Sequence, residues 1–126
     1  MKLRSPLLLL IAAAPMFGQA AAWYQTDFPP EEFKSRWAKV FQSVGENAVA
    51  ILQGVPQTNG FITPRQTNEF YYLCGIETPR SYLLLDGREK KVTLFLPPRN
   101  AALENAEGKV LSADDAELVK RLTGVD

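Results

Sequence analysis

The stretch Phe61–Gly75, Phe-Ile-Thr-Pro-Arg-Gln-Thr-Asn-Glu-Phe-Tyr-Tyr-Leu-Cys-Gly, carries more structural information than any other part of this chain. The ring of Pro64 disfavours helical geometry at the residue before it, so the chain enters this stretch extended. Thr67 can cap a short helix through its side-chain oxygen, and Gly75 can end it in the left-handed conformation. A capped turn so rich in aromatic residues predicts an element that packs into the core rather than a simple connector.

The same stretch resembles the signature of a known protein family. The pattern Arg-Gln-x-(Ser/Asn)-(Asp/Glu)-Phe-x-Tyr-Leu-x-Gly is similar to that of the N-terminal domain of the Xaa-Pro aminopeptidase (aminopeptidase P) and creatinase family. The matching residues are Arg65, Gln66, Asn68, Glu69, Phe70, Tyr72, Leu73 and Gly75. The resemblance continues in the family's order from about Glu32 to Asp126. It implies an α/β fold in which a single domain holds a mixed β-sheet flanked by helices.

The resemblance also implies where catalysis takes place in such proteins. The family's catalytic machinery sits in a second, larger "pita-bread" domain, in which two Asp, one His and two Glu hold two divalent metal ions, commonly manganese. This chain has no His and stops at Asp126. We therefore expect a truncated or fragmentary form, inactive alone, with no catalytic and no metal-binding residues and no cofactor of its own. Its expected partners are the catalytic domain, whose cleft it would help to shape, and further copies in a homo-oligomer.

One position departs from the family's pattern. Many relatives carry a large aromatic residue where Ala106 stands, directly before Glu107-Gly108. Without that ring, the resemblance does not extend to a role for this segment in completing the site of a neighbouring subunit.

Residues 1–22 have the composition of a secretory signal peptide. Lys2 and Arg4 form a basic start, Pro6–Ala14 is an apolar run, and Ala20-Ala21-Ala22 is a small-residue cleavage site. The apolar run is too short to remain as a membrane-spanning helix. We therefore expect cleavage before Trp23, export to the periplasm or beyond the cell, and a mature domain over residues 23–126.

Charge and cysteine content restrict the partners further. Without Lys2 and Arg4, the mature chain has 12 basic and 14 acidic residues, a net charge of −2. This balance does not suit nucleic acid or anionic membranes. The single cysteine, Cys74, cannot form an internal disulfide and is expected to be a small buried apolar residue. A Cys–His nucleophile pair is excluded because His is absent.

Apolar periodicity predicts the remaining elements. A helix over Phe33–Val44 carries one apolar stripe, and Lys34, Arg36 and Lys39 lie on its other faces. The apolar run within Asn47–Gln53 predicts a strand buried on both faces. The other predicted elements are a hairpin of 81–86 and 92–97, a weak helix over 100–106, and a helix capped by Ser112 that ends near Leu122.

Five residues of the signature are candidates for interdomain or cleft contacts: Arg65, Gln66, Asn68, Tyr71 and Tyr72. Arg65 could pair with a carboxylate across an interdomain or intersubunit face, or it could hold loop carbonyls before the turn. Tyr71 and Tyr72 point to different faces of a short helix, so one is expected to be wholly buried and the other to line a cleft.

Besides a supporting N-terminal domain, two other functions are open to a chain of this kind. A free-standing periplasmic binding or assembly module could keep the fold without any peptidase activity. A small independent enzyme is disfavoured, because the chain has no His and its motifs assemble no site. The acidic pairs Glu31-Glu32 and Asp114-Asp115 lie in helix first turns, where the helix dipole accounts for them without a metal.

Overall fold

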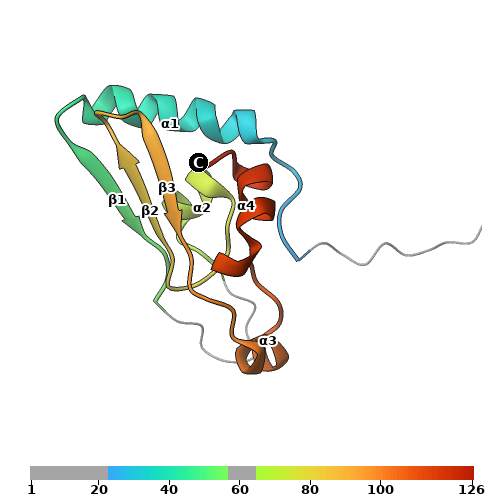
Figure 1. Ribbon diagram of the computed structural model, residues 1–126. Helices are drawn as coiled ribbons and strands as arrows, with labels where there is room; N and C mark the ends of the chain where they lie inside the picture. The colour runs from blue at the N-terminus through green and yellow to red at the C-terminus, as the bar shows by residue number, and fades with distance from the viewer. Residues whose placement is uncertain (1–22, 57–64) are drawn as a thin grey trace, which may run out of the picture.

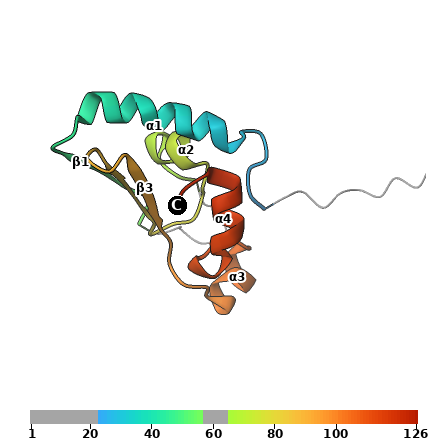
Figure 2. The same ribbon diagram turned by 45° about the horizontal axis from the view of Figure 1, so that its top comes forward.

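The computed structural model describes residues 23–56 and 65–126, so the expected leader and the first part of the Phe61–Gly75 stretch lie outside the described residues. Among these residues, helices cover one face of a three-stranded sheet, and side chains on the other face are exposed (Figures 1 and 2). The elements are α1 Pro30–Val44, β1 Val49–Gln53, α2 Asn68–Cys74, β2 Tyr82–Asp86, β3 Lys91–Phe95, α3 Ala101–Glu107, a 3₁₀ turn at Ala113–Asp115, and α4 Ala116–Thr123.

Helix α1 begins at Pro30, so Glu31 and Glu32 lie in its first turn, as predicted. Proline fits the first helical position because its missing N–H has no partner there in any helix. Phe33 and Trp37 of the apolar stripe are buried in the core, as predicted. Arg36 lies outside the apolar stripe, yet it is buried too, with only 6% of its surface exposed.

The sheet has the order β1-β2-β3 and is antiparallel throughout the described residues. These three strands form a meander, because β2 and β3 make a hairpin and the segment through α2 reverses the chain between β1 and β2. The prediction that β1 is buried on both faces was wrong. Exposure alternates along it and reaches 65% at Ile51, because the helices cover only one face.

Helix α2 forms as its caps predict. The Oγ1 atom of Thr67 accepts a hydrogen bond from the backbone N–H of Phe70 at 3.4 Å. Gly75 ends the helix in the left-handed region at φ +65°, and a Cβ there would lie 2.7 Å from Cζ of Phe33. The side chains of Phe70 and Cys74 are fully buried between the sheet and α1.

The C-terminal segment also begins at a predicted cap. The Oδ2 atom of Asp115 accepts hydrogen bonds from the backbone N–H of Ser112 at 3.0 Å and from its hydroxyl at 2.8 Å. The Oδ1 atom of Asp115 accepts from Nη2 of Arg99 at 2.8 Å. This network starts the 3₁₀ turn that leads into α4, which ends at Gly124.

Replacing Asp115 by asparagine should destabilise the domain by about 0.5–2 kcal/mol at neutral pH, as the loss of a helix cap does. Burial alone would raise the pKa of Asp115, but hydrogen bonds from Ser112 and Arg99 outweigh burial and lower it. A carboxylate with a lowered native pKa stabilises the fold above its unfolded pKa, and this stability is lost as the pH falls through the native value. The difference between Asp115→Asn and the wild type in urea unfolding should therefore shrink on acidification.

The control for this prediction is Glu117→Gln, an exposed residue of the same helix, which should change stability by less than about 0.5 kcal/mol. A difference between Asp115→Asn and the wild type that stays constant at every pH would contradict the prediction.

Candidate interdomain contact site

Gln66 connects the end of β1 to the segment that enters β2. Its Oε1 accepts a hydrogen bond from the backbone N–H of Val55 at 2.9 Å, and its Nε2 donates to the carbonyl of Thr78 at 2.5 Å. Its own backbone N–H donates to Oε2 of Glu77 at 2.7 Å. The amide group is therefore used inside the domain. Glutamine is well suited to this position because one side chain both donates and accepts.

Arg65 is placed differently, although it is the neighbour of Gln66. Its side chain is 85% exposed, and Nη1 lies 4.0 Å from Oε1 of Glu77. An exposed pair at this distance contributes little to stability. The guanidinium is thus held near a carboxylate while most of its donors still face solvent.

The prediction that one of the two tyrosines of α2 is wholly buried was wrong, because both are partly exposed. Tyr71 is half-buried, and Tyr72 is 48% exposed. The buried side of this short helix is taken by Phe70, Leu73 and Cys74. Burial raises the pKa of the Tyr71 hydroxyl, and the nearby carboxylates of Glu77 and Asp27 raise it further.

Tyr72 lines a shallow apolar groove between α1, β1 and α2. Asn68 lies on the same groove, so the structure brings these two candidates together at the surface. Gln66 is not among the lining residues, which are Val40, Leu52, Asn68, Glu69, Tyr72 and Leu73.

Arg36 of α1 contacts both the backbone and the ring of Tyr72. Its Nη1 donates to the carbonyl of Tyr72 at 2.6 Å, its Nε donates to Oε1 of Glu32 at 3.0 Å, and its guanidinium lies 4.3 Å from the ring centre of Tyr72. The ring of Phe28 lies 4.7 Å from the same guanidinium. Sequence reasoning missed this residue, and the only local signal was Glu32 one turn earlier.

Trp37, the next residue of α1, also binds a backbone carbonyl near the end of α2. Its Nε1 donates to the carbonyl of Leu73 at 2.7 Å. The last carbonyls of a helix have no partner within the helix. Arg36 and Trp37 therefore satisfy two such groups and fix α2 against α1, and the cation of Arg36 is favourably placed at the negative end of α2.

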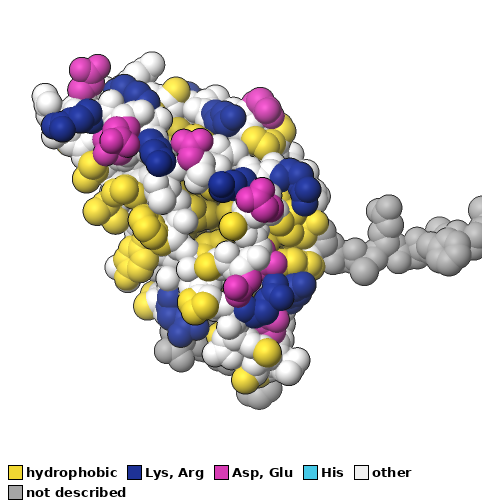
Figure 3. All heavy atoms as spheres, viewed as in Figure 1, with side chains coloured by type: hydrophobic (Ala, Val, Ile, Leu, Met, Phe, Trp, Pro, Cys, Tyr) yellow, Lys and Arg dark blue, Asp and Glu magenta, His cyan; other side chains and the backbone are white. Residues whose placement is uncertain are grey.

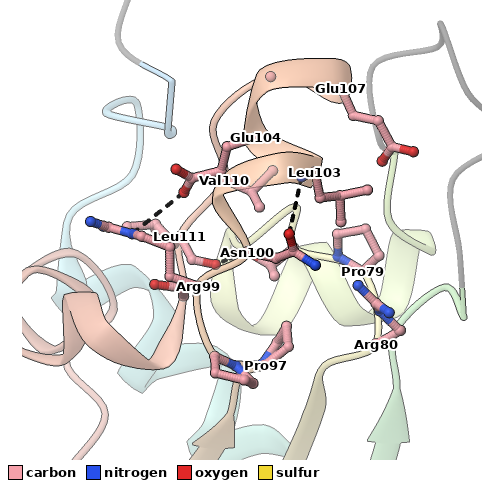
Figure 4. A pocket seen from close by; sticks show the side chains of 14 residues that line it. Pro79, Arg80, Pro97, Arg99, Asn100, Leu103, Glu104, Glu107, Val110 and Leu111 are labelled. Carbon is pink, nitrogen blue, oxygen red and sulfur yellow. Dashed lines mark hydrogen bonds and ion pairs between the residues drawn. The ribbon is translucent and has the colours of Figure 1, made fainter.

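A second hollow lies under α3 (Figure 4). Its floor is apolar and includes Pro97 and Leu103, and Arg80 and Glu107 point toward one side of it. On the other side, Nε of Arg99 lies 3.5 Å from Oε1 of Glu104. The hydrogen bond to Asp115 raises the pKa of the Arg99 guanidinium. The hollow presents side chains suited to packing.

The described residues do not fit a resident metal ion. Among residues 23–56 and 65–126, no three His, Cys, Asp or Glu side chains converge in a way that could hold one. The thiol of Cys74 is fully buried, and burial raises its pKa to about 12, so it stays protonated. In the same part of the chain, no helix has the length and apolar character needed to cross a membrane.

Comparison with known proteins places this arrangement in a family. A family model described as "Aminopeptidase P, N-terminal domain" matches residues 33–126. The chain belongs to this family. The aminopeptidase P N-terminal domain described here is 33% identical over 99 residues to the Xaa-Pro aminopeptidase of Haemophilus influenzae, covering 74% of this chain and 23% of that one. It is 30% identical over 96 residues to the "Probable Xaa-Pro aminopeptidase PEPP" of Paracoccidioides brasiliensis, covering 71% and 20%.

The fold of this aminopeptidase P N-terminal domain is also found in a solved structure. Aminopeptidase P from E. coli with the inhibitor Pro-Leu superposes with a TM-score of 0.64 at 22% sequence identity, covering 80% of this chain and 24% of that chain. The similarity confirms the α/β single-domain fold. The chain spans about a fifth to a quarter of the length of these relatives.

Proposed function

We propose that this chain is the non-catalytic N-terminal domain of an exported Xaa-Pro aminopeptidase-like protein. In this role it supports the catalytic domain, shapes access to its cleft and takes part in oligomer contacts. The observation that carries the proposal is the family match over residues 33–126. The relatives that match are Xaa-Pro aminopeptidases in which this region makes up less than a quarter of the chain.

The polar chemistry of the α2 region supports the same role. Arg65 keeps most of its hydrogen-bond donors exposed, and an arginine fork is suited to a carboxylate on another domain. Tyr72 offers an exposed ring that Arg36 holds in place. Rigid exposed tyrosines and arginines are the residue types that dominate protein contacts. Two divalent metal ions, commonly manganese in the family, would belong to the catalytic domain.

The proposal predicts that the purified chain does not hydrolyse an Xaa-Pro peptide, with or without added manganese. It also predicts that residues 33–126 can replace the matching region of the Haemophilus influenzae Xaa-Pro aminopeptidase with activity retained, whereas deletion of that region abolishes activity. Peptide hydrolysis by the three proteins provides the measurement.

Metal-dependent turnover by the pure chain would contradict the non-catalytic role. A well-folded chimera without activity would instead favour the free-standing binding or assembly module.

Export is the second part of the proposal. The basic start, apolar run and small-residue site within residues 1–22 support cleavage before Trp23. Mass spectrometry of the secreted or periplasmic product should find an N-terminus at or near Trp23. A product outside the cytoplasm that retains Met1 would refute the leader assignment.

A further inference from the structure

The segment between the expected cleavage site and helix α1 is packed onto the domain. It comprises residues 23–29, here called the N-terminal strap, and it is the blue segment that precedes α1 in Figure 1. The rings of Trp23 and Tyr24 pack against the hydrophobic core, with their centroids 5.1 Å apart in an edge-to-face contact. Hydrophobic side chains gather beside the start of the described chain (Figure 3). The strap is therefore part of the folded domain from its first residue.

The start of the strap is held by the segment between α3 and α4. The Nζ atom of Lys109 lies 4.5 Å from the centre of the Trp23 ring, a distance at which a cation is attracted to the face of an aromatic ring. Trp23 and Tyr24 also line a small hollow together with Val110 and Leu111. Trp23 is thus attached to residues that lie far from it in the sequence.

Gln25 fixes the middle of the strap. Its Oε1 accepts a hydrogen bond from the backbone N–H of Phe28 at 2.9 Å, and its Nε2 donates to the carbonyl of the same residue at 3.2 Å. A Cβ added to Gly75 would lie 3.0 Å from Cγ of Gln25. The strap therefore crosses the end of α2 in close contact.

Phe28 holds the end of the strap that leads into α1. Its ring lies 4.7 Å from the guanidinium of Arg36, and its centroid lies 6.3 Å from that of Phe33 in an edge-to-face arrangement. The strap thus contacts the domain at its start, its middle and its end.

Removal of the leader requires hydrolysis of the peptide bond between Ala22 and Trp23. The reaction adds one water molecule and leaves a carboxylate on Ala22 and an ammonium group on Trp23. A peptidase must bind residues on both sides of the bond that it cuts, and in a folded protein it acts on a transiently opened segment. On the product side of this bond, those residues are Trp23 and its neighbours in the strap.

We propose that the docked strap blocks leader removal, so that cleavage after Ala22 precedes the folding of the domain around Trp23. The folded precursor is then a poor substrate for the leader peptidase, and residues 23–29 are a structural part of the mature domain. This inference rests on the proposed export of the chain, and it adds the order of cleavage and folding.

The test compares the full chain, residues 1–126, with a synthetic peptide of residues 1–30. The peptide carries the leader and the strap but lacks Lys109, Gly75 and the other residues on which the strap docks. Both are treated with the same purified leader peptidase, and mass spectrometry follows the products. We expect cleavage after Ala22 in both, at least about tenfold more slowly in the folded chain, because the strap must first open.

The two substrates separate the leader assignment from the protection by the strap. A peptide that is not cut after Ala22 would refute the leader, and the inference with it. Equal rates for the peptide and the folded chain would overturn the protection while the leader assignment stands.

Substitutions outside the strap change its docking without changing the sequence that the peptidase binds. Lys109→Glu removes the cation from the Trp23 ring and should speed cleavage of the folded chain by about two- to fivefold, the range of an exposed cation–π contact. Lys39→Glu, at an exposed position of α1, makes the same change in charge and should leave the rate unchanged. If both variants raise the rate equally, the cause is net charge and the proposal fails. Urea unfolding of each variant checks that its fold is intact.

Discussion

Gln66→Met is expected to lower the free energy of unfolding by about 1–3 kcal/mol. Methionine keeps the length of the side chain but neither accepts from the N–H of Val55 nor donates to the carbonyl of Thr78. The carbonyl of Thr78 keeps a bond from the hydroxyl of Ser81 at 2.8 Å. Most of the loss should come from the N–H of Val55, which is partly buried, because a fully buried donor without a partner costs about 1–3 kcal/mol.

Urea unfolding followed by the fluorescence of the buried Trp37 would measure this loss. The matched control is Arg65→Met, which removes an exposed side chain next to Gln66 and should change stability by less than about 0.5 kcal/mol. Equal effects of the two substitutions would show that the Gln66 amide does not hold the two segments together.

Gly87→Ala should be at least as destabilising, by about 3 kcal/mol. Gly87 follows β2, and its N–H donates to the carbonyl of Ala48 at 3.1 Å. A Cβ added there would overlap the carbonyl oxygen of Gly45 and lie 2.7 Å from that of Ala48. Both atoms belong to the backbone that joins α1 to β1, so relief requires moving the turn itself.

The comparison for this substitution is Glu89→Ala, at an exposed position of the same hairpin turn, which should be nearly neutral. Thermal unfolding of the two variants provides the measurement. A Gly87→Ala domain as stable as the wild type would mean that the turn can shift without loss.

Local signals in the sequence were sufficient for the helix ends. Thr67 and Gly75 bracket α2, and Ser112 starts the segment that leads into α4, because caps act on neighbouring residues. The apolar stripe also placed Phe33 and Trp37 correctly in the core. These predictions depend on residues within one or two turns of each other.

The features that the sequence did not predict depend on contacts between distant segments. The guanidinium of Arg36 is buried because it binds the carbonyl of Tyr72, and the sequence around Arg36 gives no sign of that partner. The apolar sequence of β1 fits a strand with one covered face as well as a strand with two. The exposure of Ile51 could therefore not be predicted without knowing which face of the sheet the helices cover.

The candidate contact residues show the same limit. Arg65 and Gln66 are neighbours in one motif, yet Gln66 is engaged in bonds inside the domain and Arg65 is largely exposed. Gln66 differs from Arg65 because it binds the backbone of Val55 and of Thr78. A local sequence pattern does not identify these two partners.

The burial of Cys74 has a practical consequence. Its thiol has no exposed surface and a pKa of about 12, so the native protein offers alkylating reagents almost no thiolate. The Cys74 thiol can be alkylated only after α2 separates from α1 and the sheet. The rate of that reaction, at reagent concentrations where reclosing is faster than modification, measures the equilibrium for opening this one helix. The chain thus carries a single chemical reporter for the mobility of α2, the helix that bears Tyr72, without any added label.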